Sequence, residues 1–386
     1  MAEKDPEKIK SVPREMMKDI KFSSDAADVC EDPEVDIVVE LVGGIEPAFS
    51  FVSKALNSEK YVVTANKDLM ANRGEELYKI AEQNNVDILF EASVLGGIPI
   101  IGPLKTTLAS DRIYKIVGIV NGTTNYILTK MEKNGLSFEE ALADAQELGY
   151  AEKANPSADV EGYDAACKLA ILSSIAFNSR VVLEDVYKEG ITKITAGDIE
   201  FAREMGYCIK LLAIGTEEDG KISARVHPAL IPAGHILASI EDVFNAVYVY
   251  GKYIDRIMSY GRGAGDRATA SSVVGDIVNI ARKFDRGKKG IIYGCSCFEN
   301  KTVSSIDETI SKFYIVMDVA DRPGVLANIA KVFGDHDVSI NSMIQKQTGI
   351  DNRAKLIFIT HLAANKNLYS SIEKLKKLDV VESIQN

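Results

Sequence analysis

The first hundred residues alternate between short apolar runs and longer stretches with helical spacing. The run at 35–41, VDIVVEL, is rich in β-branched apolar residues, which is typical of a buried parallel strand. Two further strands are predicted at 61–64 and 86–90, with helices at 47–57 and 68–84 between them. This strand–helix–strand–helix–strand order indicates βαβ units in a parallel sheet.

The central part of the chain mixes both patterns and predicts an α+β domain. The predicted strands lie at 113–120, 207–216, 221–228 and 246–250, and the predicted helices at 126–134, 138–148, 163–177 and 270–284. The last of these helices follows a glycine-rich segment at 261–265. A polar stretch at 285–290, DRGKKG, is a candidate linker.

The tail, from about residue 313, shows a regular succession of short predicted strands and helices. Its predicted elements are strands at 314–319, 339–347, 355–361 and 380–384 and helices at 325–335 and 368–378. The resulting order, βαββαβ, is the ferredoxin-like pattern. We therefore expect a third, C-terminal domain.

Composition and charge exclude several classes of function. The hydrophobic and charged fractions, 46% and 26%, are those of an ordinary globular protein, and a net charge of −11 argues against a nucleic-acid partner. No apolar run approaches the ~20 residues of a membrane span, and the polar start lacks a signal peptide. We therefore expect a cytoplasmic protein without membrane contact. The five irregularly spaced cysteines are interpreted as incidental free thiols rather than as zinc ligands.

A parallel sheet followed by a polar central domain suggests a dinucleotide enzyme, yet the usual fingerprint is missing. Such folds open with a strand and a G-x-G-x-x-G turn that binds pyrophosphate. No glycine precedes Gly43 in this chain, and the Gly43-Gly44 turn lacks the third glycine. The sequence therefore predicts either a truncated nucleotide-binding fold or a different mode of binding.

The stretch Asp159-Val-Glu-Gly-Tyr-Asp164-Ala-Ala-Cys-Lys168 is the richest in candidate chemistry. If Gly162 starts a helix, Asp164 and Lys168 fall on one face at i,i+4. A lysine beside a carboxylate can pass a proton to or from an alcohol or aldehyde oxygen. The spacing alone rather favours a surface ion pair, which contributes a few tenths of a kcal/mol.

Two motifs follow predicted strands of the parallel sheet. Lys67, in TANK, lies where α/β sheets bind ligands, and could meet a phosphate or a carboxylate rather than solvent. Glu91, followed by a Gly-Gly turn, could offer oxygen atoms to a hard cation.

Three polar or glycine-rich turns precede predicted helices. Asn121-Gly-Thr-Thr-Asn125 could hold a polar substrate or merely cap its helix. The 261–265 loop could bind an anion at a helix N-terminus. Asp321-Arg-Pro-Gly324 could admit a small ligand or serve only as a cap.

In this order, the motifs resemble homoserine dehydrogenase. The similarity runs from about Val35 to Phe284 and includes VDIVVELVGGIEPA, VVTANK, LFEASVLGGIPII, NGTTNYILTKM, GYAEKANPSADVEGYDAACKLAIL, VHPALIP, VFNAVYVYG and YGRGAGDRATASSVVGDI. The tail, beginning DRPGVLANIA, resembles an ACT domain, the regulatory module of long forms of this enzyme.

The resemblance implies an enzyme that interconverts L-homoserine and L-aspartate 4-semialdehyde with NAD or NADP, on the route to threonine and methionine. It implies that Lys168 is the acid/base residue and that Asp164 orients it. It further implies that Glu152, Asp159 and Thr123 bind the substrate and that the cofactor contacts Val42, Gly43, Lys67, Gly263 and Gly265. A structural sodium ion would be held by Glu91 with the carbonyls of Val94, Gly96 and Ile98. An effector such as threonine would bind at Asp321, Gly324 and Asn341. A homodimer or homotetramer is also implied.

The implied fold is α/β with three domains. Residues 1–112 would form an incomplete Rossmann-type parallel sheet without its first βα unit. Residues 113–300 would form an α+β catalytic and dimerisation domain, whose helix 269–284 packs back on the nucleotide domain. Residues 312–386 would form the ferredoxin-like ACT domain.

Three departures from the family pattern leave alternatives open. About sixty residues with the first strand and glycine-rich turn are expected to be missing, an extra residue separates Glu152 from Asp159, and Ala268 replaces the usual proline. The alternatives to a working dehydrogenase are an inactive fragment that binds an amino acid through its tail, and a structural subunit that only dimerises.

Overall fold

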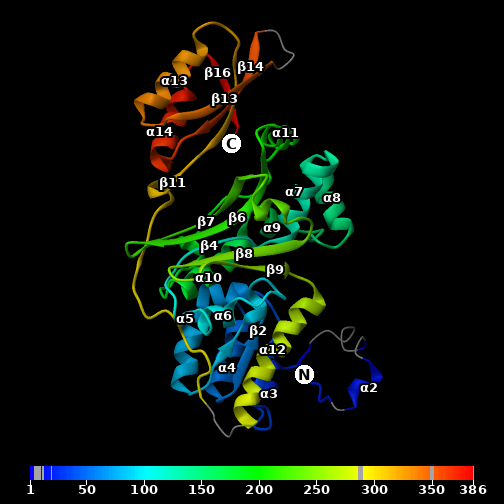
Figure 1. The fold of residues 1–386 in the computed structure, drawn as a ribbon. Coiled ribbons are helices and arrows are strands. Elements are labelled where there is room, and N and C mark those ends of the chain that lie inside the picture. Colours follow the sequence, from blue (N-terminus) through cyan, green and yellow to red (C-terminus); the bar gives the residue numbers. More distant parts are fainter. Residues whose placement is uncertain (4–9, 11–12, 19, 286–289, 348–351, 386) are drawn as a thin grey trace.

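The computed structural model describes residues 1–3, 10, 13–18, 20–285, 290–347 and 352–385. Figure 1 shows three bodies in chain order, with the blue N-terminal body at one end and the orange and red C-terminal body at the other. The first two bodies share one continuous apolar cluster, whereas the C-terminal body has its own. No helix among the described residues is long and apolar enough to cross a membrane.

The N-terminal body is built on a three-stranded parallel sheet in the order β1–β2–β3. Every residue of β2 is buried, which explains its continuous apolar sequence. The predicted parallel sheet is confirmed, although β1 and β3 are shorter than expected. The elements are α2 (Arg14–Met17), α3 (Ala26–Glu31), β1 (Ile37–Glu40), α4 (Ala48–Asn57), β2 (Tyr61–Thr64), α5 (Lys67–Gln83), β3 (Ile88–Leu89), η1 (Glu91–Ser93) and α6 (Ile101–Lys105).

The central body contains a seven-stranded sheet in the order β10–β7–β6–β4–β8–β9, with β5 paired to β7. Its strands are β4 (Ile113–Ile119), β5 (Tyr187–Lys188), β6 (Tyr207–Glu218), β7 (Lys221–Pro232), β8 (Phe244–Gly251), β9 (Asp255–Arg262) and β10 (Thr302–Val303). Its helices are α7 (Gly122–Asn134), α8 (Phe138–Glu147), α9 (Ser157–Val160), α10 (Tyr163–Ala176), η2 (Leu183–Asp185), α11 (Ala196–Glu204), η3 (Ile236–Ser239) and α12 (Asp266–Asp285).

In the central body, besides several elements of two to four residues, two longer elements were not predicted from the sequence, β9 and α11. The strand β9 pairs with β8 along its whole length, yet most of its residues are exposed, so it lacks a buried apolar pattern. The helix α11 has only three buried positions. Both elements depend on neighbours that are remote in the chain rather than on a strong local pattern.

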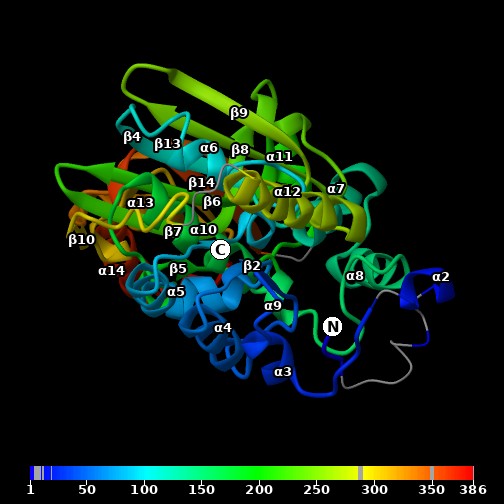
Figure 2. The same cartoon turned by 90° about the horizontal axis from the view of Figure 1, so that it is seen from below.

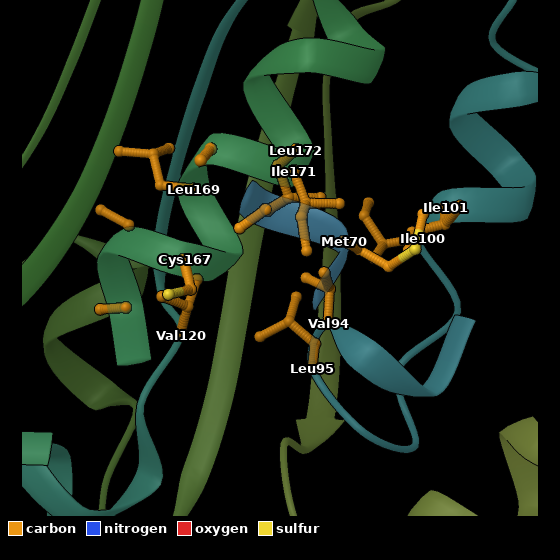
Figure 3. Close-up of a cluster of buried hydrophobic side chains, with 14 of the residues drawn as sticks. Met70, Val94, Leu95, Ile100, Ile101, Val120, Cys167, Leu169, Ile171 and Leu172 are labelled. Atoms are coloured by element: carbon orange, nitrogen blue, oxygen red, sulfur yellow. The ribbon is translucent and has the colours of Figure 1, made fainter. Parts of the chain in front are cut away.

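The helix α10 lies between the first two bodies. It contacts α5 of the N-terminal body and β6 and β7 of the central sheet, and every residue from Asp164 to Ala176 is buried. Figure 3 shows Leu169, Ile171 and Leu172 of this helix among apolar side chains from the segments on either side. A helix that is apolar on all sides is stable only inside such a sandwich. Its packing therefore fixes the position of its first turn.

The C-terminal body has the predicted ferredoxin-like arrangement. Its four antiparallel strands follow the order β13–β14–β12–β16, and α13 packs against α14. The elements are η4 (Ile306–Glu308), β11 (Ile310–Ser311), β12 (Tyr314–Ala320), α13 (Val325–Asp335), β13 (Ile340–Gln347), β14 (Arg353–Thr360), β15 (Ala363–Ala364), α14 (Asn365–Leu375) and β16 (Val381–Gln385). The predicted order of strands and helices is confirmed.

A strap formed by residues 290–301 runs from the N-terminal body to the central body. Its start is held by Asp87, whose Oδ2 accepts the backbone N–H groups of residues 292–294 at 2.8, 2.7 and 3.1 Å. Its end is held where the Glu299 N–H donates to the carbonyl of Asn178 at 2.8 Å. Most of the predicted linker, residues 286–289, lies outside the described residues. Figure 2 shows the same bodies from below. The helix α12 packs against η1 and β2 of the N-terminal body.

We predict that Asp87→Ala lowers the free energy of unfolding by about 3 kcal/mol, because it leaves three strap N–H groups without their acceptor. Urea unfolding of the full chain measures this. The control is Asp219→Asn in the exposed β6–β7 turn, which should change stability little. Equal stability of the two variants would contradict the role given to Asp87.

Candidate functional site

An amine and a carboxylate lie side by side at the start of α10. Gly162 precedes the helix in the left-handed conformation, with φ of 83°, and Asp164 and Lys168 follow one turn apart. Lys168 Nζ donates to Asp164 Oδ2 at 2.6 Å and to the carbonyl oxygen of Val120 at 2.8 Å. The two side chains are only 10% and 9% exposed. The alternative of a solvated surface ion pair is therefore wrong.

The carboxylate of Asp164 contacts two further donor groups besides Lys168. Lys67 Nζ is 3.3 Å from its Oδ1, and Asn121 Nδ2 donates to its Oδ2 at 2.8 Å. Burial by itself would raise the pKa of Asp164, but the charges of Lys168 and Lys67 and the hydrogen bonds together lower it. The carboxylate is therefore ionised at neutral pH although it is buried.

Lys67 reaches this cluster from the N-terminal body. It is the first residue of α5, which follows β2. The preceding residue, Asn66, caps α5 because its side chain accepts the Leu69 N–H at 3.0 Å. Burial opposes its charge, but Asp164 and Asp68 outweigh burial and raise the pKa of Lys67. Because parallel sheets bind ligands at the carboxyl ends of their strands, the cluster lies at the expected ligand-binding edge.

Asn121 connects the cluster to α7. Its Oδ1 accepts the Thr124 N–H at 2.8 Å and so caps the helix, while its Nδ2 donates to Asp159 at 2.7 Å as well as to Asp164. Sequence reasoning treated 121–125 as one polar turn and did not single out this residue. The available signal was an asparagine between a strand and a helix, which predicts a cap but not the two carboxylates that it joins.

The three residues expected to hold the substrate do not all meet. Asp159 borders Asn121, and burial together with the nearby charge of Asp164 raises its pKa. The Thr123 hydroxyl donates to the carbonyl of Tyr150 at 2.7 Å and also interacts with Asp159. The side chain of Glu152 is exposed to solvent. The structure therefore brings Asp159 and Thr123 to the cluster and leaves Glu152 at its edge.

The turn after β1 is shaped by a buried glutamate. Glu40 accepts the N–H groups of Val42 and Gly43 at 2.7 and 3.2 Å and the Thr64 hydroxyl at 2.6 Å. Those two N–H groups are thus satisfied within the protein and not directed at a phosphate. The turn instead exposes apolar side chains, with Leu41 at 64% and Val42 at 60%. An apolar surface at this edge of a parallel sheet fits an aromatic ring better than an anion.

Two glycine-rich loops pack so closely that side chains do not fit between them. A Cβ atom on Gly96 would lie 2.6 Å from the carbonyl oxygen of Gly263, and one on Gly263 would lie 1.3 Å from Asn245 Oδ1. Gly265 has φ of 113°, which favours glycine. The loop around Gly96 is also tied to α12, because Ser272 donates to the Gly96 carbonyl at 2.7 Å. These contacts fix the loop that precedes α12.

The Glu91 carboxylate, expected from the sequence to bind a cation, accepts backbone N–H groups of the protein. Its two carboxylate oxygens accept the backbone N–H groups of residues 100–102 at 2.6 to 2.7 Å, at the start of α6. The Gly96 carbonyl, another expected ligand, accepts from Ser272. The described part of the chain contains no group of three or more His, Cys, Asp or Glu side chains that could hold a metal. The carboxylate acts as a helix cap, which its sequence context did not reveal.

Three families match successive parts of the chain. Residues 1–91 match the homoserine dehydrogenase NAD-binding domain, residues 99–278 match homoserine dehydrogenase, and residues 313–380 match the ACT domain. The homoserine dehydrogenases of Corynebacterium glutamicum and Bacillus subtilis are 47% and 42% identical over 97% and 99% of this chain, which covers 84% and 88% of their own lengths. This chain belongs to the homoserine dehydrogenase family.

Solved structures of homoserine dehydrogenases share the fold. The enzyme from Thiobacillus denitrificans matches 99% of this chain and 87% of its own, with 38% identity and a TM-score of 0.92. A hyperthermophilic archaeal homoserine dehydrogenase in complex with NADPH matches 71% of this chain and 78% of its own, with 30% identity and a TM-score of 0.60. The family assigns the chain an NAD(P)-binding domain and the interconversion of L-homoserine and L-aspartate 4-semialdehyde. These matches do not favour the alternative of an inactive amino-acid-binding fragment.

In the ACT domain of this homoserine dehydrogenase, the three expected effector residues do not lie together. Asp321 and Gly324 form the turn between β12 and α13, and Gly324 has φ of 89°. Gln345 Nε2 donates to Asp321 at 3.1 Å, whereas Asn341 lies near the other end of β13, 3.4 Å from His361. Asn341 and Gln345 are four positions apart along the strand, a span of about 13 Å. One ACT domain therefore does not bring Asn341 beside Asp321.

We predict that Asp164→Asn lowers the free energy of unfolding by about 3 to 5 kcal/mol near neutral pH, because two lysines lose their buried partner. The folded-state pKa of Asp164 is lowered, so its contribution is present above its ordinary value of 3.8 and is lost as the pH falls through the folded value. The deficit of the variant relative to the natural chain should therefore shrink in strong acid.

Urea unfolding at a series of pH values measures this deficit. Asp219→Asn, in an exposed turn, serves as the control and should show no deficit near neutral pH. A deficit for Asp164→Asn that stays constant into strong acid would contradict the assignment.

Proposed function

We propose that Lys168 carries the proton in the homoserine dehydrogenase reaction and that Asp164 orients it. The observation that supports this is the direction of the Lys168 hydrogen bonds. An ammonium group has three N–H bonds, and two of them point to Asp164 and to the Val120 carbonyl. One direction is left for an oxygen of the substrate.

When bound, NAD(P)H supplies the hydride that reduces the carbonyl carbon of L-aspartate 4-semialdehyde. As that carbon is reduced, Lys168 donates a proton to the carbonyl oxygen, and in the reverse direction it takes the proton from the hydroxyl of L-homoserine. Asp164 keeps the amine in place. Lys67, on the other side of Asp164, adds positive charge where negative charge develops on the oxygen.

The carboxylates and hydroxyl near α7 are proposed to hold the amino-acid part of the substrate. Asp159 is joined to Asp164 by Asn121, whose Nδ2 donates to both carboxylates. Asp159 can accept from the substrate ammonium group, and Thr123 lies beside it. Glu152, whose side chain is exposed, is included in this set from the family resemblance. Burial of a carboxylate is tolerated when a cation pairs with it, so the ammonium group would complete the charge balance around Asp159.

The cofactor is proposed to lie against the turn after β1. The exposed Val42 side chain and Gly43 would contact a ring, with Lys67 beside them and the Gly263–Gly265 loop opposite. The likeness to an archaeal enzyme solved with NADPH supports NADP, with NAD as the alternative. We assign no step of the reaction to the sodium ion that the family resemblance implies; the Glu91 carboxylate and the Gly96 carbonyl also accept protein donors. A structural sodium ion held by Glu91 with the carbonyls of Val94, Gly96 and Ile98 stays a proposal from the family.

The physiological setting is proposed from the family. The enzyme would act in the cytoplasm on the route to threonine and methionine, with threonine as the effector of the ACT domain. A homodimer or homotetramer is supported by β9, an edge strand that exposes Ile257, Met258 and Tyr260. The three domains proposed from the sequence span 1–112, 113–300 and 312–386.

We predict that Lys168→Ala reduces kcat for homoserine-dependent NAD(P) reduction by about a hundredfold or more, the usual contribution of a positioned acid or base. Lys168→Arg should be similarly impaired, because a guanidinium keeps the charge but cannot give up its proton. Lys133→Ala, at the exposed end of α7, is the control and should retain activity. Near-normal kcat in Lys168→Ala, with an unchanged circular dichroism spectrum, would remove Lys168 from the mechanism.

We predict that threonine raises the thermal midpoint of the ACT domain, and that Gly324→Val abolishes this rise by straining a residue with positive φ. Asp321→Asn, which removes a charge without changing the backbone, should weaken it. The matched control is Gly334→Ala on α13, where a methyl group meets nothing within 4 Å. An identical threonine response in Asp321→Asn and the control would place the effector elsewhere.

A further inference from the structure

Two cysteines occupy the strap between its anchors on the two bodies. Cys295 and Cys297 follow the segment held by Asp87 and precede the contact of Glu299 with Asn178. Both residues are half-buried. Neither belongs to the site around Lys168, which is at the opposite end of α10.

The strap covers a cavity beneath these thiols. Its volume is about 470 Å³, and it lies between α5, α10 and the strap. Tyr78, Phe90, Lys105 and Arg180 line it together with the cysteines. Lys105 donates to the carbonyl of Gly294, the residue before Cys295, at 2.7 Å. A small polar reagent can therefore reach the sulfur atoms from a space large enough to hold it.

The surroundings of the two thiols shift their pKa values in opposite directions. The backbone N–H of Cys297 lies 3.5 Å from the sulfur of Cys295, and the Cys297 sulfur lies 3.7 Å from the carbonyl oxygen of Ser174. Hydrogen bonding from Cys297, opposed by burial and aided by Lys105, lowers the pKa of Cys295 to about 6. The same interaction, together with burial, raises the pKa of Cys297. The interaction between the two thiols thus favours the thiolate on Cys295 and the proton on Cys297.

The other cysteines have the opposite character. Cys30, Cys167 and Cys208 are buried, and burial raises the pKa of each thiol. Because the thiolate is the reactive form, oxidation should select the strap over these three positions.

We propose that Cys295 and Cys297 form a dithiol modification site that a hydroperoxide oxidises to a disulfide within the strap. The Cys295 thiolate attacks one oxygen of hydrogen peroxide, the O–O bond breaks, and the hydroxide that leaves takes a proton to form water. The Cys297 sulfur then attacks the resulting sulfenic acid, loses its proton and displaces the hydroxyl group as a second water. The two thiols lose two electrons, and the peroxide gains them.

A disulfide here would act on the strap rather than on the active site. Closing the S–S bond brings residues 295 and 297 to a fixed separation, while the segment on either side stays anchored to a different body. We therefore expect the hydrogen-exchange rates of the oxidised and reduced chains to differ only in the strap, including the N–H groups held by Asp87. This inference does not rest on the roles proposed for Lys168 and Asp164.

The test is brief treatment of the full chain with hydrogen peroxide, alkylation of the remaining thiols with N-ethylmaleimide, and peptide mass spectrometry. We expect the strap peptide to lose two hydrogen atoms and to escape alkylation, and dithiothreitol to restore both thiols. Cys297→Ser should stop at a sulfenic acid on Cys295, which dimedone traps. Cys208→Ser, at a buried thiol, is the matched control and should behave as the natural chain does.

Two further measurements make the proposal falsifiable. The rate of iodoacetamide labelling at Cys295 should be half-maximal near its lowered pKa of about 6 and not near the ordinary 9.0. A parallel sample with oxidised glutathione separates a stable mixed disulfide from the strap disulfide. The proposal is overturned if the buried cysteines oxidise before the strap, if glutathione stays attached without strap closure, or if Cys295 labels like an ordinary thiol.

Discussion

Buried charge at the start of α10 is the constraint on which the arrangement of the two sheets depends. A carboxylate removed from water costs several kcal/mol unless cations and hydrogen-bond donors surround it. Asp164 obtains one cation from its own helix and the other, Lys67, from the N-terminal body. The two bodies must therefore meet at this point, and the same contact leaves a lysine N–H direction available to a substrate.

Close backbone packing fixes the remaining walls of the site. The loops at 94–98 and 261–265 approach each other through glycines, and α12 then returns to the N-terminal sheet. Glu40 and Glu91 satisfy backbone N–H groups in two turns that follow parallel strands. Both carboxylates thus stabilise the turns in which they lie.

The C-terminal body is coupled to the rest of the chain through few elements. Its apolar core is separate, so it can shift without opening the core of the other two bodies. Polar contacts such as Tyr314 with Asp198 and Lys346 with Glu204 join it to α11, and the strap joins it through the backbone. Effects of an amino acid bound in the tail, or of oxidation in the strap, would have to pass along these connections.

The sequence by itself determined the parallel sheet, the ferredoxin-like tail and the helical spacing of Asp164 and Lys168, because hydrophobic periodicity and i,i+4 geometry are local properties. Only the tertiary structure decided whether that pair was buried, which donors Glu91 accepts, how Asn121 joins two carboxylates, and that Asn341 lies far from Asp321. Each of these depends on residues remote in the chain, and the exposed strand β9 escaped prediction because its partner, not its own pattern, stabilises it.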